Sequence, residues 1–138
     1  MKSEYYWLAL IVLQTALMFI PYAMNLFYKQ GLIGALHYYD PKNPPLSDWA
    51  QKAKAAHMNA VENLVLIAPA TLLYLLMRRD GGSDETVLLC LQVYFFARIA
   101  HYIVYAMRLN YVRTVFFFAG WIPTVIIIFK AIQLATAL

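Results

Sequence analysis

Polar and charged side chains stand in a segment that is otherwise apolar enough for a membrane. In AKAAHMNAVENLVLIAPATLLYLL, residues 53–76, His57, Asn59 and Glu62 lie where polar sequence gives way to a long apolar run. Together with Lys52, Asn59 and Glu62 are spaced at i, i+7 and i+10, which predicts one stripe on a helix. Ionisable groups at membrane depth are costly and normally face a partner helix or a wet cavity. The stripe therefore indicates a polar site at the edge of a membrane.

A second stripe follows in a later apolar segment and runs toward the same membrane side. Its members are spaced at i, i+3, i+7 and i+10 along a helix: Arg98, His101, Tyr105 and Arg108. Arg113 and Thr114 begin the last apolar segment on that side. An arginine at a helix N-terminus would stabilise a thiolate, because positive charge and the helix dipole both lower a thiol pKa.

Two interpretations of these stripes are open. In the first, the groups satisfy one another: Glu62 neutralises Arg98, and Asn59 bonds across helices. In the second, they face an anionic ligand, because the cations on this side outnumber Glu62, the one acid placed within the membrane. Guanidinium groups also bind carboxylates in a bidentate manner. A ligand with carboxylates, amides and a thiol would use all of these side chains, and glutathione is such a ligand.

Composition and hydropathy place the stripes in an integral membrane protein. Of the 138 residues, 63% are apolar and only 13% are charged, a balance that excludes an ordinary soluble domain. Four apolar segments are each long enough to cross ~30 Å of hydrocarbon. They are predicted as helices over about 5–27, 49–77, 85–109 and 111–134. We therefore expect one domain over residues 1–138, an all-α bundle of four transmembrane helices.

Proline, glycine and capping residues mark the ends of the predicted spans. Pro21 predicts a kink near the end of the first span. Residues 28–48, which include DPKNPP, predict a polar loop, with Ser47 as N-cap of the second span. The polar turn RRDGGSDE offers Ser83 or Asp84 as N-cap of the third span. The link to the fourth span is so short that the last two spans are predicted to be antiparallel neighbours.

The distribution of lysine and arginine predicts the orientation in the membrane. One side holds Lys29, Lys42, Lys52, Lys54, Arg108 and Arg113, and the opposite side holds Lys2, Arg78 and Arg79. The richer side is predicted to be cytoplasmic, so the polar site faces the cytoplasm in either a bacterial inner membrane or the endoplasmic reticulum. Lys130, deep in the fourth span, is predicted to snorkel to the other interface. The single cysteine, Cys90, excludes an intrachain disulfide, and we expect neither a metal site nor nucleic-acid binding.

Two segments resemble the MAPEG family, the membrane-associated proteins in eicosanoid and glutathione metabolism. AHMNAVEN resembles the family signature Arg-Ala-x-x-Asn-x-x-Glu, although Ala55 stands where the family has arginine. ARIAHYIVYAMRLNYVRTVFF, residues 97–117, resembles the third-to-fourth helix region of the microsomal prostaglandin E synthase and microsomal glutathione transferase types. Length and predicted spans also fit, so the resemblance covers essentially the whole chain.

The resemblance implies a four-helix protomer in a homotrimer, with glutathione bound between neighbouring subunits near the cytoplasmic face. The glutathione-binding positions that it implies are Lys29, Lys52, Asn59, Glu62, His101, Tyr105 and Arg113. Arg113 is further implied to hold the thiolate, with Thr114 as a hydrogen-bond donor to the sulfur. Arg98 is implied to be structural, and we interpret His57 as structural too.

Three functions are consistent with these residues. The resemblance favours a glutathione transferase or glutathione-dependent peroxidase that acts on lipophilic electrophiles or lipid hydroperoxides. The alternative enzyme is a prostaglandin-synthase-like isomerase that uses glutathione as a cofactor. A non-catalytic lipid-binding scaffold is the third, but it predicts eroded glutathione positions, and only the arginine at position 55 is lost. We interpret most of Phe116, Phe117, Phe118 and Trp121 as lipid-facing, with an apolar substrate cleft as the alternative.

Overall fold

The computed structural model describes residues 3–37, 46–78 and 82–137, and all of its regular structure is helical. The helices are α1 (Glu4–Leu17), α2 (Ile20–Leu36), α3 (Asp48–Met77), α4 (Glu85–Ala106) and α5 (Asn110–Thr136). Four stretches are long and apolar enough to cross a membrane: α1 with α2, α3, α4 and α5. The predicted all-α membrane fold is therefore supported by the helices that the structure describes.

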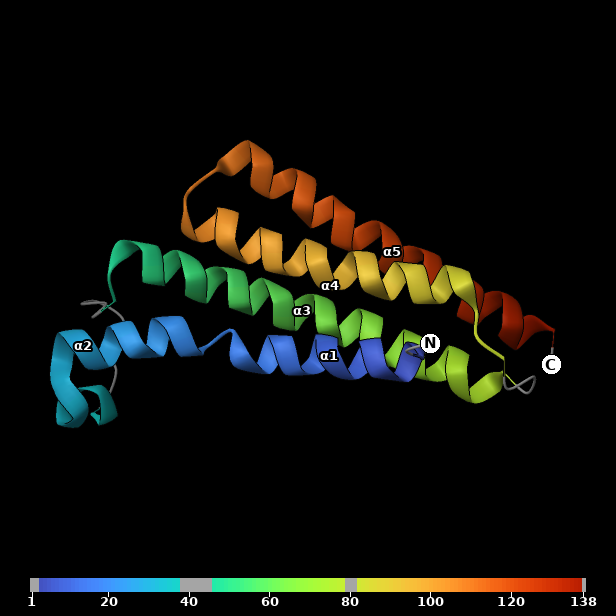
Figure 1. Cartoon of the computed structure of the whole chain (residues 1–138), viewed down its shortest axis with the longest axis horizontal. Coiled ribbons are helices and arrows are strands. Elements are labelled where there is room, and N and C mark those ends of the chain that lie inside the picture. Colours follow the sequence, from blue (N-terminus) through green and yellow to red (C-terminus); the bar gives the residue numbers. More distant parts are fainter. Residues whose placement is uncertain (1–2, 38–45, 79–81, 138) are drawn as a thin grey trace.

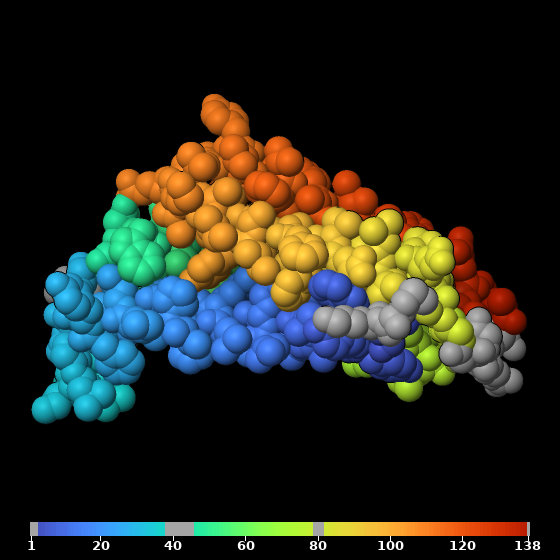
Figure 2. Space-filling view, viewed as in Figure 1, coloured from blue at the N-terminus to red at the C-terminus, as the bar shows by residue number. Residues whose placement is uncertain are grey.

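The helices form an elongated bundle in which α4 contacts α1, α3 and α5, whereas α2 contacts α3 (Figure 1). At one end lie α2, the N-terminus of α3 and the α4–α5 turn; we call it the Arg113 end. The described chain ends lie toward the opposite end, with the N-terminus of α4, and we call it the Asp84 end (Figure 1). Figure 2 shows side chains covering the helices along the length of the bundle, with the tip of α2 projecting at one end.

The core is built from apolar side chains that α1, α3 and α5 turn toward α4, whereas none of the described residues of α2 is buried. Ile11 of α1, Ile67 of α3 and Ile127 of α5 are fully buried, and they meet Leu91 and Tyr94 of α4. Three buried threonines, Thr15, Thr71 and Thr124, each donate a hydroxyl hydrogen bond to the carbonyl one turn earlier in the same helix, so they add no unsatisfied donor to the apolar interior.

The first span is broken, and the break precedes the predicted kink. Helix α1 ends at Leu17 and α2 begins at Ile20, so Pro21 lies in the first turn of α2. A proline has no N–H to give to the carbonyl one turn earlier, and the first helical turn is where that loss costs least. Tyr102 of α4 donates a hydrogen bond of 2.9 Å to the Met18 carbonyl at the break.

The loop predicted over residues 28–48 is wrong in its first part, because α2 continues to Leu36. A second irregularity occurs at Gly31, where φ is 68° and a side chain would be disfavoured. The prediction from DPKNPP lies outside the described residues, and so do the contributions of Lys2, Lys42 and Arg79 to the predicted orientation.

One of the two predicted caps forms. Asp84 accepts hydrogen bonds from the N–H groups of Thr86 (2.9 Å) and Val87 (3.2 Å), so of the two candidate residues Asp84 caps α4. Ser47 precedes α3 but makes no capping bond. Instead its hydroxyl accepts from the Asn25 side chain at 2.9 Å, and its N–H donates to that side chain at 2.8 Å. Ser47 therefore ties α2 to α3.

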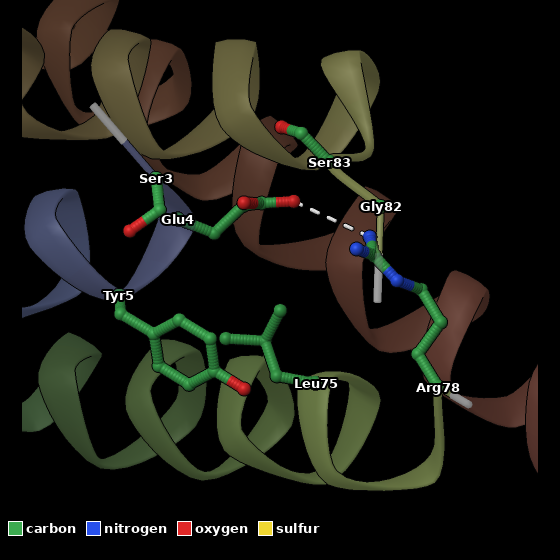
Figure 3. A pocket seen from close by; sticks show the side chains of 7 residues that line it. All are labelled: Ser3, Glu4, Tyr5, Leu75, Arg78, Gly82 and Ser83. Carbon is green, nitrogen blue, oxygen red and sulfur yellow. Dashed lines mark hydrogen bonds and ion pairs between the residues drawn. The ribbon is translucent and has the colours of Figure 1, made fainter. Parts of the chain in front are cut away.

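Acidic groups at the Asp84 end are paired with cations. Glu4 accepts from the Arg78 guanidinium at 3.3 Å and from the Asp84 N–H at 2.7 Å, beside a hollow of about 180 Å³ (Figure 3). The Asp84 carboxylate accepts from the Lys130 ammonium at 2.6 Å and from the Tyr74 hydroxyl. Burial by itself raises the pKa of Asp84, but the hydrogen bonds from Lys130 and Tyr74 outweigh burial and hold that pKa at about 2. Lys130 thus forms an ion pair at the Asp84 end, which is the end toward which it was predicted to snorkel.

Candidate functional site

A cavity of about 450 Å³ opens at the Arg113 end between α3, α4 and α5. This volume lies within the roughly 300–1,000 Å³ of small-molecule sites. Its lining residues are Asn59, His101, Tyr105, Arg113, Thr114, Phe117 and Phe118. The first five were predicted from the two stripes and from the start of the last span. The structure therefore brings most of the predicted site together in one hollow, with an apolar wall on α5.

Arg113 supplies positive charge in the first turn of α5. Its guanidinium carbon lies 4.7 Å from the centre of the Tyr105 ring, a cation–π contact that holds the side chain over α4. Leu109 precedes α5 without a capping side chain, and the first turn of α5 contains no acidic residue. In the described part of the chain no carboxylate pairs with Arg113. The uncapped N–H groups and the guanidinium together form a place where an anion is stabilised.

Thr114 lies next to Arg113 and is exposed. Its hydroxyl donates a 3.3 Å hydrogen bond to the Asn110 carbonyl in the preceding turn. A hydroxyl has one proton and two acceptor lone pairs. In this rotamer Thr114 can accept a hydrogen bond from a thiol, and its hydroxyl must rotate in order to donate a hydrogen bond to a thiolate.

His101 and Tyr105 form the α4 wall of the cavity. The His101 side chain is buried, and its ring centre lies 5.6 Å from that of Tyr105 and 6.4 Å from that of Phe117. The two α4 residues are one turn apart, so a helix sets them side by side. Their imidazole and hydroxyl can each donate to, or accept from, a bound ligand.

Asn59 is oriented by a buried arginine behind the cavity. Arg98 is only 1% exposed, and its Nη1 donates a 2.9 Å hydrogen bond to Asn59 Oδ1. The guanidinium also lies over the rings of Tyr94 (5.1 Å) and Phe117 (5.7 Å). Because Oδ1 of Asn59 is taken by Arg98, its amide nitrogen is the group left for the cavity. Arg98 Nε and Nη2 have no hydrogen-bond partner among the described residues.

These contacts bear on the first interpretation of the stripes, in which the polar groups satisfy one another. The predicted bond of Asn59 across helices is confirmed, and its partner is Arg98. The predicted neutralisation of Arg98 by Glu62 does not occur in the described structure, because Glu62 lies exposed on α3. Three residues along a helix correspond to about 300°, so Glu62 is turned about 60° away from Asn59 and off the cavity. Internal pairing thus accounts for Asn59 and leaves Arg113 without an acidic partner.

Four other predicted residues lie outside the cavity lining. Lys52 is exposed near the start of α3, and Lys29 is exposed on α2. Arg108 follows the end of α4 and forms an ion pair with Asp48. His57 shares a 2.7 Å hydrogen bond with the Tyr22 hydroxyl, which confirms its predicted structural role.

Sequence reasoning missed the residue that makes room for Arg98. Gly120 of α5 is buried, and a Cβ built there would lie 3.1 Å from Arg98 Nε. The available signal was a lone glycine inside an apolar span, since small residues let membrane helices approach closely. Phe117 and Phe118 also line the cavity, whereas most of this aromatic run was interpreted as lipid-facing.

The comparisons with known proteins bear on the whole bundle. No curated protein matches the chain. The family model described as the MAPEG family matches residues 4–133, a region that contains every residue lining the cavity. With four apolar stretches that can cross a membrane and a family match over nearly its full length, this chain belongs to the MAPEG family.

Proposed function

We propose that the protein is a membrane-bound glutathione transferase or glutathione-dependent peroxidase that acts on lipophilic electrophiles or lipid hydroperoxides. The observation that supports this proposal is Arg113, a cation without a carboxylate partner in the described chain, at the uncapped start of α5. It shares its cavity with polar groups on α3 and α4 and with two phenylalanines. Such a site suits an anionic sulfur beside an apolar substrate.

The donors in the cavity fit part of glutathione. Glutathione carries carboxylates, amides and a thiol, and the cavity offers a guanidinium, an imidazole, an amide nitrogen and hydroxyls. Lys52, Glu62 and Lys29 are exposed outside this cavity. We propose that the chain forms the homotrimer implied by its resemblance, so that these residues reach glutathione at a boundary with a neighbouring subunit.

Each residue of the cavity then has a distinct task. Bound glutathione supplies a nucleophilic sulfur. Arg113 and the free N–H groups of α5 favour the thiolate over the thiol, because positive charge stabilises an anion. Asn59, His101 and Tyr105 hold the tripeptide so that its sulfur points at the second substrate, and such orientation is a large part of enzymatic acceleration. Phe117 and Phe118 contact the apolar substrate, which the membrane concentrates beside α5.

The cytoplasmic orientation of the Arg113 end belongs to the same proposal. Lys29, Lys52, Arg108 and Arg113 lie in α2, the start of α3, the α4–α5 turn and the start of α5 (Figure 1). Basic residues are retained on the cytoplasmic side of a membrane. Soluble glutathione would then reach the cavity directly from the cytoplasm, whether the protein lies in a bacterial inner membrane or in the endoplasmic reticulum.

The test is glutathione binding to the detergent-purified protein, followed by the ultraviolet absorbance of the thiolate at neutral pH. We expect Arg113→Ala to lose the thiolate signal and to reduce turnover far more than affinity. Thr114→Val tests the neighbouring hydroxyl, and Thr136→Val is its matched control, because Thr136 is also exposed on α5 and bonds its own helix at the other end. Equal losses of turnover and affinity in Arg113→Ala would contradict a role at the sulfur.

A glutathione-dependent isomerase is the second candidate, and the sequence of residues 97–117 favours it through its resemblance to the prostaglandin synthase type. Product analysis separates the two enzymes, because an isomerase leaves the total glutathione unchanged while a transferase or peroxidase consumes it. Absence of binding at millimolar glutathione would instead favour the lipid-binding scaffold.

A further inference from the structure

The turn after α4 has an arginine where glycine is favoured. The N–H of Leu109 donates to the Val104 carbonyl at 3.0 Å, and that of Arg108 donates to the Tyr105 carbonyl at 3.1 Å. These two bonds are those of the Schellman motif, in which the residue after the C-cap adopts the left-handed conformation. That residue is Arg108, with φ at 64°, the only described non-glycine residue with positive φ. A side chain is disfavoured in this conformation, so the contacts that the Arg108 side chain makes are of interest.

The side chain of Arg108 has a partner on another helix. Its guanidinium forms an ion pair with Asp48, the first residue of α3. The pair therefore connects the α4–α5 turn to the N-terminus of α3. The cavity is lined by residues of the same three helices, α3, α4 and α5. Helix α5 diverges from α4 toward this end of the bundle (Figure 1). The carboxylate is also well placed on α3, since negative charge is stabilised at a helix N-terminus.

Few other contacts hold the start of α5. Leu109 provides no capping bond, and the first three residues of α5 are exposed. Tyr111 is 93% exposed, so it packs against almost nothing in the chain. The cation–π contact of Arg113 with Tyr105 joins this part of α5 to α4. The position of Arg113 thus depends on how the turn is tethered five residues earlier.

We propose that Asp48 and Arg108 form a clasp, a pair of positioning residues that fixes the start of α5 against α3 and thereby sets Arg113 over the cavity. The consequence for catalysis rests on the proposed function, whereas the tether itself does not. Both side chains are more than half exposed, so the pair is weak. A weak tether suffices, because it orders a helix end rather than the whole fold. We expect its loss to weaken glutathione binding about two- to fivefold.

Arg108→Gly separates positioning from folding. Glycine relieves the left-handed backbone and removes the clasp, so thermal stability should be equal or higher while the KM for glutathione rises two- to fivefold. Asp48→Asn leaves the backbone unchanged and should raise KM to a similar degree. Combining the two substitutions should be no worse than either alone. If the pair only stabilised the fold, the KM for glutathione would rise only in the variants whose melting temperature falls.

A distance measurement tests the clasp without glutathione. Spin labels on cysteines at Gln51 and Tyr111, both exposed, report the separation of the starts of α3 and α5. Cys90 is buried and can remain. The labelled chain is diluted into an excess of unlabelled chain, so that each proposed trimer carries at most one labelled protomer. We then expect one narrow distance distribution in the labelled parent, a broad one in Arg108→Gly and in Asp48→Asn, and a narrow one again when Asp48→Arg is combined with Arg108→Asp. Aspartate tolerates the left-handed conformation, so the exchanged pair can form.

The outcomes of the two experiments are distinct. Broadening in the single variants together with no glutathione binding would support the clasp and overturn the proposed function. Unchanged distance distributions in Arg108→Gly and Asp48→Asn would overturn the clasp, whatever the protein binds. In 1 M salt the parent should broaden too, so that its difference from the variants vanishes, because the screening length there is only about 3 Å. A parent that stays narrow in 1 M salt would contradict an electrostatic tether.

Discussion

Replacing Gly120 with alanine tests how tightly the cavity is built from behind. A Cβ at this position would lie 3.1 Å from Arg98 Nε, 3.3 Å from Nη2 and 3.4 Å from Cζ. Arg98 cannot simply retreat, because its guanidinium lies over the rings of Tyr94 and Phe117. If the guanidinium of Arg98 moves away from the new Cβ, its hydrogen bond to Asn59 lengthens. We expect the Asn59 amide, which faces the cavity, to turn as a result.

Two opposing terms set the size of the effect. Overpacking a well-packed interior costs about 1–3 kcal/mol. Alanine in place of glycine in a helix interior recovers about 1 kcal/mol. The net loss of stability in Gly120→Ala is therefore on the order of 0–2 kcal/mol. The hydrogen bond from a charged guanidinium is worth about 1.5–3 kcal/mol, so weakening it should reduce glutathione affinity by roughly tenfold.

The assay compares affinity and unfolding in Gly120→Ala, in Arg98→Lys and in the double variant. Lysine lacks the planar group that the new Cβ would touch, so Gly120→Ala should cost little more once Arg98→Lys is present. A double-mutant cycle measures this coupling directly. Additive effects, or an affinity in Gly120→Ala equal to that of the parent, would refute the argument that Gly120 shapes the site through Arg98.

Two further predictions concern opposite ends of the bundle. Tyr105→Leu should lower the turnover with glutathione about two- to fivefold, because leucine has no ring for the Arg113 guanidinium to contact. Tyr105→Phe keeps that ring and should lower the turnover less. Equal losses in the two variants would assign the effect to the Tyr105 hydroxyl. The pKa of Asp84 lies at about 2 in the folded protein, below its ordinary value of 3.8, so its contribution is complete above about pH 4 and is lost as the pH falls through 2. This corresponds to roughly 2 kcal/mol in acid unfolding curves, and Asp84→Asn should remove that part of the pH dependence while keeping a capping side chain.

Helical spacing predicted the contents of the cavity where the helices are regular. His101 and Tyr105 are one turn apart on α4 and line it together, and Asn59 meets them from α3. Spacing assigns residues to a stripe, but it does not give the angle of that stripe toward a neighbouring helix. Glu62 therefore belongs to the predicted stripe and still lies outside the cavity.

Arg108 illustrates a different limit of the same reasoning. Its spacing from Arg98 is helical, but α4 ends at Ala106 and the backbone at Arg108 is left-handed. Beyond a helix end the spacing no longer predicts a direction, and the side chain reaches Asp48. Likewise, residues 28–48 were predicted to form a loop, whereas α2 continues through Gly31, where the backbone φ is positive.

Half-buried charged side chains have different kinds of partner at the two ends of the bundle. At the Asp84 end each described carboxylate that is half-buried or buried has a cation: Glu4 has Arg78, and Asp84 has Lys130. At the Arg113 end the arginine in the cavity has an aromatic ring and no carboxylate in the described chain. Cations at a helix N-terminus are destabilised by the helix dipole, and a partly buried cation loses hydration. At the Arg113 end the exposed Arg108 has Asp48, but the half-buried Arg113 has no carboxylate in the described chain. An anion in the cavity would therefore be stabilised by Arg113, and this is the physical reason to expect a thiolate there.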